Sequence, residues 1–248
     1  MDEEKDNEDA WREDRQRQED IILGIFRLVS NTQPMTQQHN PQDVLDLWFP
    51  DNGHWQTSET HIAFWTERMQ GGMDAIICEK FAELTEAAAR GGLDHWAETP
   101  RGRLALLIAL DQFSRSLWRD TPAAFSQDIK ACCLCLEGVA NGHYAALDNM
   151  WEQQFYVIAM SHCEGPDHLA RMDHCIQLTD DAIKNLPSEI AGMGPMAAEQ
   201  GHRVRANIER FGRHPHRNEV LGRPSTPDEQ SYIKTGDFPH QRKIETGP

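Results

Sequence analysis

Four dipeptides of one kind stand at intervals along this chain and constrain its fold. Each places an asparagine or a threonine directly before a proline: Asn40-Pro41, Thr99-Pro100, Thr121-Pro122 and Thr226-Pro227. Proline suits the first turn of a helix, because the N–H that it lacks has no intrahelical partner there. The preceding side-chain oxygen can accept a hydrogen bond from a free backbone N–H group of that turn. The four dipeptides therefore predict four helix N-termini.

Helix stops and apolar spacing complete this pattern. Pairs such as Gly91-Gly92 and Asn141-Gly142 end helical stretches, and no window alternates apolar and polar residues long enough to predict a strand. We expect helices over residues 41–49, 59–69, 73–90, 100–118, 122–140, 148–163, 167–186 and 196–211, and from 227 onward. Short connections favour antiparallel neighbours, so the sequence predicts an all-α domain of stacked antiparallel helical hairpins.

The net charge and the length of the apolar runs limit the kinds of partner and the cell compartment that we expect for this protein. The formal charge of −16 argues against a nucleic-acid partner, which needs a basic surface, and against an anionic membrane surface. The early apolar run at residues 21–26 is interrupted by Arg27 and is far shorter than the roughly 20 residues that span a bilayer. Its acidic lead also lacks the positive start of a signal peptide. We therefore expect a cytoplasmic protein with no membrane contact, whose six cysteines are reduced thiols.

Polar composition divides the chain into three parts. Residues 1–20 are polar and lack apolar periodicity, and residues 30–40 are rich in Gln, Asn, Ser and Thr. We therefore expect an acidic, disordered extension over 1–39, followed by a single all-α domain over 40–235 and a flexible tail over 236–248. Two interpretations of the extension remain open. In the first, translation starts at Met35 and the preceding residues are read from upstream. In the second, the extension is a regulatory tail in which residues 21–29 form a docking helix.

The predicted helix over 100–118 carries an apolar stripe that ends in charged groups. Leu104, Ile108, Asp111, Arg115 and Arg119 follow one another at spacings of four, three, four and four, which places them on one face. One interpretation is a structural ion pair between Asp111 and Arg115. The other is a pocket floor, in which Arg115 and Arg119 hold an anionic ligand, Asp111 orients them and Gln112 lies beside them.

A second stripe ends in a histidine. Trp151, Phe155, Ile158 and His162 share a helix face, and Glu164 follows in the next turn of chain. His162 is either a hydrogen-bonded core residue or a general base. The neighbouring His and acidic residues match no recognised metal-site spacing, so we predict no metal and no cofactor.

A third cluster follows the helix over 196–211. Residues 210–218 contain three arginines, two histidines and an asparagine, which is dense for so acidic a chain. Basic groups at a helix C-terminus complement the helix dipole, which is the structural explanation. Loops also carry binding groups, which makes Arg213, His216, Arg217 and Asn218 candidates for ligand contact.

The cysteine-rich stretch at 132–135 is not expected to bind metal. On a helix, Cys132 and Cys135 share a face while Cys133 points elsewhere, and no second cysteine pair stands nearby at ligand spacing. Buried free cysteine packs as a small apolar residue. We therefore predict that Cys132 and Cys135 fill the core.

Several motifs together resemble an uncharacterised, largely bacterial family, domain of unknown function 924. The segments that carry the resemblance are residues 41–49, 94–96, 100–104, 111–115, 161–164, 210–218, 221–223 and 225–227. They cover nearly all of residues 40–233. The resemblance implies a tetratricopeptide-repeat-like helical fold and brings no established activity with it.

Two classes of function follow from these residues. The first is a pocket protein, enzymatic or not, that binds a small anionic ligand through the three polar clusters. Its ligand contacts would be Asp111, Gln112, Arg115, Arg119, Arg213, Arg217 and Asn218, and its catalytic candidates are His162, His216 and Glu164. The alternative is a scaffold for a protein or peptide partner, in which the charged groups form isolated ion pairs between helices.

Overall fold

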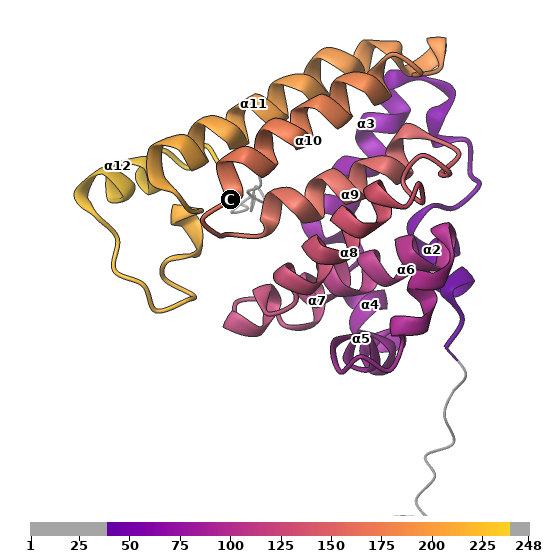
Figure 1. Cartoon of the computed structure of the whole chain (residues 1–248), viewed down its shortest axis with the longest axis horizontal. Coiled ribbons are helices and arrows are strands. Elements are labelled where there is room, and N and C mark those ends of the chain that lie inside the picture. The colour runs from indigo at the N-terminus through magenta and orange to yellow at the C-terminus, as the bar shows by residue number, and fades with distance from the viewer. Residues whose placement is uncertain (1–38, 239–248) are drawn as a thin grey trace, which may run out of the picture. The chain divides into compact units, whose positions relative to one another are not determined.

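The computed structural model describes residues 39–238, and every regular element in that range is helical (Figure 1). The all-α prediction is therefore confirmed, whereas the tetratricopeptide-like detail stays a prediction. The α-helices are α2 (Pro41–Trp48), α3 (Ser58–Glu67), α4 (Asp74–Lys80), α5 (Ala82–Ala89), α6 (Pro100–Leu107), α7 (Ser114–Leu117), α8 (Asp128–Ala140), α9 (Met150–His162), α10 (His168–Ile183), α11 (Gly194–Phe211) and α12 (Pro227–Thr235). The predictions for residues 1–38 and 239–248 lie outside the described residues.

Three of the four Asn/Thr-Pro dipeptides begin α-helices, as the sequence predicts. The side chains of Asn40 and Thr99 accept hydrogen bonds from backbone N–H groups of α2 and α6, and Thr226 forms a capping box with Glu229 at α12. Thr121-Pro122 begins only a short 3₁₀ turn, η5 (Pro122–Phe125).

The expected bounds of two helices are wrong. The helix expected over 122–140 starts at Asp128 instead, because the Thr121 hydroxyl donates to the carbonyl of Trp118 at 2.7 Å and caps nothing. The helix expected over 73–90 is interrupted at Phe81, whose backbone leaves the helical region at φ −119°. The Phe81 ring packs edge-on against Phe113, with 5.2 Å between ring centroids, so the interruption turns this ring into the core.

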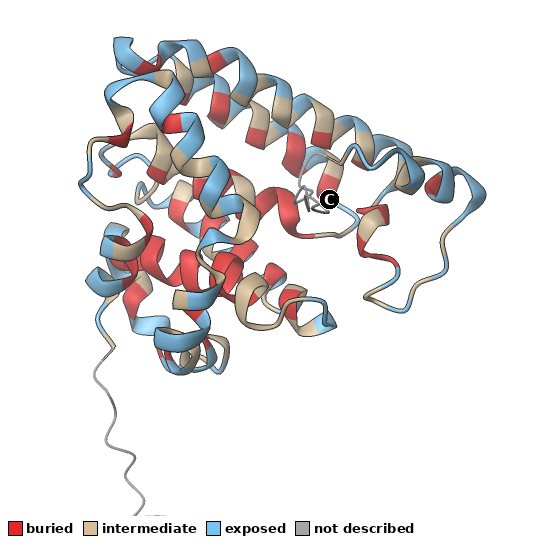
Figure 2. Ribbon diagram, turned by 180° about the vertical axis from the view of Figure 1, so that it is seen from behind, coloured by how far each residue is buried: buried red, intermediate tan, exposed pale blue. Residues whose placement is uncertain are grey.

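The core surrounds one central segment of the chain. Residues 102–114 are all buried and run through α6, the π-helical turn η4 (Ile108–Phe113) and the start of α7. Figure 2 shows the buried residues gathered along this segment and the helices beside it. A π turn closes hydrogen bonds five residues apart, so it shifts the register of the stripe expected from the sequence. Asp111 and Gln112 lie within this wider turn.

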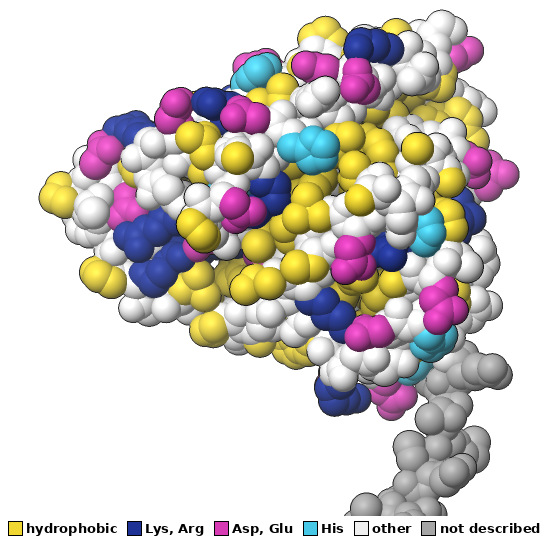
Figure 3. Space-filling view, in the orientation of Figure 1, with side chains coloured by type: hydrophobic (Ala, Val, Ile, Leu, Met, Phe, Trp, Pro, Cys, Tyr) yellow, Lys and Arg dark blue, Asp and Glu magenta, His cyan; other side chains and the backbone are white. Residues whose placement is uncertain are grey.

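Consecutive helices from α8 to α11 each pack on the next one. Contacts join α8 to α9, α9 to α10 and α10 to α11, and Figure 1 shows α10 and α11 lying side by side. Cys132 and Cys135 of α8 are buried in the core, whereas Cys133 is exposed, which confirms the sequence prediction. On the face in Figure 3, acidic and basic side chains are interspersed around apolar ones. No helix of the described range is long and apolar enough to span a membrane.

At Gly138, α8 leaves no room for a side chain, so Gly138→Ala is expected to destabilise the fold. An added Cβ would lie 2.6 Å from Cε1 of Tyr156 and 2.8 Å from Cδ of Arg103, both of which are buried. We expect the free energy of unfolding to fall by about 1–3 kcal/mol, measured by urea denaturation. Gly192→Ala is the control, because its Cβ would meet Ser58 Oγ at an ordinary 3.4 Å. Equal stability of the two variants would contradict this close approach.

Candidate functional site

A buried carboxylate and a buried imidazole form the centre of the site. Asp111 comes from the π turn η4 and His162 from the C-terminal end of α9. His162 Nδ1 lies 2.9 Å and 3.1 Å from the two carboxylate oxygens of Asp111, and Gln112 Nε2 donates to the same carboxylate at 2.5 Å. Burial lowers the pKa of His162 well below its ordinary value, and Arg115 and Arg217 lower it further. The neutral ring therefore donates from Nδ1 to Asp111 and carries its lone pair on Nε2.

A second carboxylate joins two arginines from distant parts of the chain. Asp128, in the first turn of α8, is 5% exposed and accepts from Arg115 Nη2 and Arg217 Nη1, both at 2.9 Å. Arg115 also lies 3.1 Å from Asp111, and Arg217 Nη1 donates to the carbonyl oxygen of His162 at 2.9 Å. Asp111, Arg115, Asp128, His162 and Arg217 thus form one connected network.

A pocket of about 460 Å³ opens beside this network, and we call it the arginine pocket. It is lined by six of the residues that the sequence singles out: Gln112, Arg115, Arg119, His162, His216 and Arg217. The structure therefore brings residues of all three polar clusters together around one cavity. Their roles in binding or catalysis stay predictions.

Besides Asp111, whose carboxylate contacts the pocket residues His162 and Arg115, three further sequence candidates do not line the arginine pocket. Arg213 is paired with Glu229 on α12, at 2.7 Å and 2.9 Å. Asn218 is fully buried and bonds to Ser225 and Arg223, where it fixes the loop after α11. Both side chains stabilise that loop. The third candidate, Glu164, lines a different pocket.

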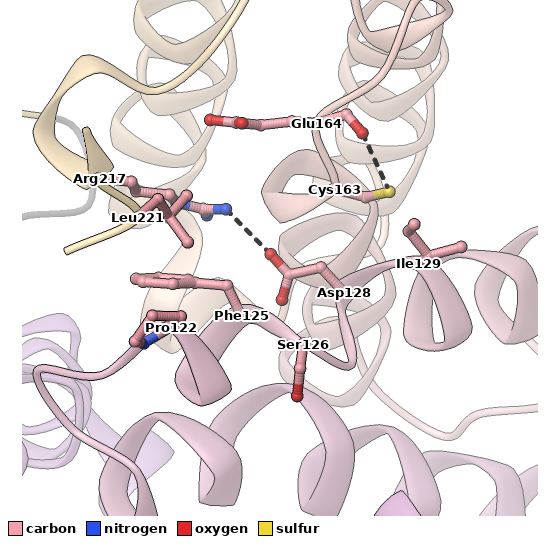
Figure 4. A pocket seen from close by; sticks show the side chains of 9 residues that line it. All are labelled: Pro122, Phe125, Ser126, Asp128, Ile129, Cys163, Glu164, Arg217 and Leu221. Atoms are coloured by element: carbon pink, nitrogen blue, oxygen red, sulfur yellow. Dashed lines mark hydrogen bonds and ion pairs between the residues drawn. The ribbon is translucent and has the colours of Figure 1, made fainter. Parts of the chain in front are cut away.

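That different pocket is smaller, about 250 Å³, and we call it the cysteine pocket (Figure 4). Glu164 lies at its edge, where it pairs with Arg223 and accepts the backbone N–H of His214 at 2.7 Å. Cys163 and Asp128 also line it. Phe125 and Arg217 line both pockets and so lie between them.

Several lining atoms of the arginine pocket lack a hydrogen-bond partner among the described residues. They are three donors, Trp48 Nε1, Arg68 Nε and Arg217 Nε, and one acceptor, Gln70 Oε1. Trp48 and Arg217 are each 3% exposed. Buried polar atoms are rarely left unpaired, and such atoms mark places where a protein meets water or a ligand.

The charges of the lining arginines are compensated unequally. Burial lowers the pKa of Arg115, but Asp111 and Asp128 outweigh burial and raise it overall. Arg119 is paired with Asp74 at 2.6 Å. The pKa values of Arg68 and Arg217, in contrast, are lowered, chiefly by burial. The two arginines with unpartnered Nε atoms are therefore those in which the effect of burial on the pKa outweighs that of the neighbouring carboxylates.

Sequence reasoning missed three residues of this site. Trp48 lies inside the expected helix 41–49, Arg68 lies at the end of the expected helix 59–69, and Asp128 lies inside the expected helix 122–140. Arg68 begins a π turn, η2 (Arg68–Gly72), which shapes one side of the arginine pocket. No spacing in the sequence marks these three residues, because each reaches the site only through long-range packing.

The geometry thus defines an all-α protein with a buried polar network between two pockets. The model of a family described as a bacterial protein of unknown function (DUF924) matches residues 44–237, so the chain belongs to this family. A solved structure, of a protein of unknown function from Agrobacterium tumefaciens, is similar to the chain at 28% identity and a TM-score of 0.60. The match covers 79% of this chain and 97% of that one. No curated protein matches the chain.

Proposed function

We propose that this protein binds a small anionic molecule in the arginine pocket. The observation that carries the proposal is the set of unpartnered donors on Trp48, Arg68 and Arg217, three N–H groups against one unpartnered acceptor. Such a set is complemented by a ligand rich in acceptor oxygens, such as a carboxylate or a phosphate. The volume of about 460 Å³ also falls in the range of small-molecule sites, roughly 300–1,000 Å³.

The charge balance supports an anion over a neutral ligand. Arg68 makes no ion pair among the described residues, and its guanidinium instead stacks over Phe64 at 3.8 Å and donates to the Leu47 carbonyl at 3.3 Å. Arginine is well suited to bind carboxylate and phosphate because its planar fork presents paired donors. An anion that reaches Arg68 and Arg217 would offset the burial of the two arginines whose pKa values the neighbouring carboxylates do not restore.

The same pocket holds groups suited to acid–base chemistry. His162 lines it as a neutral imidazole oriented by Asp111, which is the arrangement of a general base. Burial lowers the pKa of His216 to about 4, with Arg217 adding to the effect, so this ring is also neutral near pH 7. If the protein turns its ligand over, we propose His162 as the base and the arginines as the groups that stabilise negative charge.

Arg68→Gln is expected to weaken anion binding without unfolding the protein. A thermal-shift screen of the full chain with inorganic phosphate, small dicarboxylates and sugar phosphates would find a stabilising anion. At a hundred times its dissociation constant, such an anion adds about 2.7 kcal/mol to the free energy of unfolding. Loss of a charged hydrogen bond at Arg68 costs about 1.5–3 kcal/mol, so the dissociation constant rises by about tenfold or more.

The matched control is Arg90→Gln, which removes an exposed arginine paired only with Glu86. Its affinity should equal that of the unmodified chain. Trp48→Phe provides a second arm, because it keeps most of the aromatic packing and removes one unpartnered donor. A broad anion panel that shifts neither the unmodified chain nor the variants would overturn the proposal. It would then favour the alternative of a scaffold for a protein or peptide.

A further inference from the structure

The arginine pocket contains one buried acceptor that a plain anion leaves unmatched. Gln70 lines the pocket, and its Oε1 atom is buried without a hydrogen-bond partner among the described residues. The oxygens of a carboxylate or phosphate group only accept, so such a group pairs with the N–H donors of the pocket and not with Gln70 Oε1. Because buried acceptors are rarely left unpaired, the ligand has to supply a donor as well.

The fold holds this acceptor beside one of the unpartnered donors. Gln70 lies in the π turn η2, two residues after Arg68, whose Nε atom is unpartnered. The turn reverses at Gly71, whose φ of 93° lies in the left-handed region that glycine adopts readily. It also packs closely against the end of α3, since a Cβ added at Gly72 would lie 2.9 Å from the carbonyl oxygen of Glu67. One tightly packed turn thus presents both a donor and an acceptor to the ligand.

Other glutamines add acceptors to the wall of the arginine pocket. Gln112 Nε2 donates to the Asp111 carboxylate at 2.5 Å, and because a carboxylate only accepts, this contact fixes which end of the amide is the nitrogen. The oxygen is the end of the Gln112 amide that remains to accept a hydrogen bond. Gln154 and Gln200 line the pocket as well. Amide groups both donate and accept, so this wall suits a ligand that does the same.

Part of the same wall is apolar, which indicates an organic ligand. Ala124, Phe125 and Ile158 line the arginine pocket together with Trp48. An inorganic anion makes no use of such a surface. The carbon skeleton of an organic anion, in contrast, is removed from water when it lies against these side chains.

The charges around Gln70 favour a hydroxyl over an ammonium group as the donor of the ligand. Arg68 makes no ion pair among the described residues, so its positive charge would repel an ammonium group beside Gln70. The two carboxylates that line the pocket lie by Arg119: Asp74 pairs with it at 2.6 Å, and Asp120 follows it in the sequence. A hydroxyl group donates to an amide oxygen and carries no charge, so it meets no such repulsion.

We propose that the ligand of the arginine pocket is a hydroxylated organic anion, either a hydroxycarboxylic acid or a polyol phosphate, whose hydroxyl donates to Gln70 Oε1. The assignment rests on the proposed function, since it names the class of ligand for the same site. The anionic group accepts from the unpartnered N–H groups of the pocket, and the carbon skeleton lies against the apolar part of the wall.

Isothermal titration calorimetry of the full chain with matched anions is the test. Succinate, malate and aspartate share one dicarboxylate skeleton and carry a hydrogen, a hydroxyl and an ammonium group at the same carbon. Propyl phosphate and glycerol phosphate form a second series, which differs in hydroxyl groups alone. The series that binds more tightly identifies the anionic group as carboxylate or phosphate. Within that series, we expect the hydroxylated member, in its better-bound enantiomer, to bind about tenfold more tightly than the others.

Gln70→Leu removes the acceptor and keeps a side chain of similar size. It should weaken binding of the hydroxylated anion about tenfold and leave the affinity for the anion without a hydroxyl unchanged. Gln177→Leu is the matched control, because Gln177 is exposed on α10 and lines neither pocket. Its affinities for both anions should equal those of the unmodified chain.

Equal binding of the hydroxylated and unhydroxylated anions would overturn this assignment and leave the proposed function standing, because anions would still bind. Tighter binding of aspartate than of malate would overturn it in the same way. So would a preference for the hydroxylated anion that survives in Gln70→Leu. If no anion binds at all, the assignment fails together with the proposed function.

Discussion

Acidification from pH 7.5 to pH 5 is expected to remove most of the stability of this fold. Burial lowers the pKa of four histidines, His54, His61, His168 and His216, from 6.5 to about 4. Their hydrogen bonds fit neutral rings: Trp65 Nε1 donates to His61 Nε2 at 3.1 Å, which leaves His61 Nδ1 to donate to His54 Nδ1 at 3.0 Å. A proton added to either ring breaks this chain of donors and acceptors.

The direction of this pH effect follows from which state of the chain, folded or unfolded, binds more protons. Between pH 6.5 and pH 4 these histidines are protonated in the unfolded chain and neutral in the folded one, so unfolding takes up protons. Stability is therefore complete above pH 6.5, falls as the pH falls, and reaches its lowest value below pH 4. Each histidine costs about 1.4 kcal/mol per pH unit in this window. At pH 5 the four together cost on the order of 8 kcal/mol, which is comparable to the whole stability of a typical domain.

Urea denaturation at several pH values between 5 and 8 measures this effect. His54→Gln removes one titrating ring, so the slope of stability against pH should decrease by about 1.4 kcal/mol per pH unit. His202→Gln removes an exposed histidine and should leave the slope as it is. A urea midpoint that stays constant from pH 7 to pH 5 would contradict the prediction, because it would show that the folded and unfolded chains take up the same number of protons and that burial does not lower the pKa of these histidines.

The sequence predicted correctly those helix N-termini that are stabilised by hydrogen bonds between residues close together in the chain. Asn40, Thr99 and Thr226 cap helices through hydrogen bonds to backbone atoms two or three residues away, so their dipeptides are sufficient evidence. Thr121 has the same sequence context but donates to Trp118 instead, next to Asp120 in the left-handed region at φ 59°. The η5 turn packs against α7, and the dipeptide does not encode this contact.

The candidate site was only partly predictable for the same reason. Stripes that end in Asp111, Arg115 and His162 are visible as periodicity, because each lies on a helix with a continuous apolar face. Asp128 has no such signal, although it joins Arg115 to Arg217, which is 89 residues away from it in the sequence. Arg68 also escapes notice, since a basic residue near a helix end is ordinary. Only packing brings it to the pocket.

Asp128→Asn is expected to be among the most destabilising single substitutions in the described part of the chain. The carboxylate is 5% exposed and accepts one hydrogen bond from each of Arg115 and Arg217 at 2.9 Å. Removing one member of a buried ion pair leaves an uncompensated buried charge and costs about 3–5 kcal/mol. Here two guanidiniums lose their shared partner, so we expect the upper part of that range in urea denaturation. Asp180→Asn, at an exposed position, is the control and should change stability little.

A second substitution tests whether Asp128 and Arg217 stabilise each other. Arg217→Met removes one of the two guanidiniums, so Asp128→Asn should cost less in that background than alone, with a coupling of about 0.5–3 kcal/mol. Additive losses would mean that Asp128 and Arg217 do not stabilise each other.

Stability and binding should also move in opposite directions in Asp128→Asn, because the lost carboxylate leaves Arg115 and Arg217 more positive. If the arginine pocket binds an anion, the destabilised protein should bind it more tightly. A purely structural ion network would show the loss of stability alone.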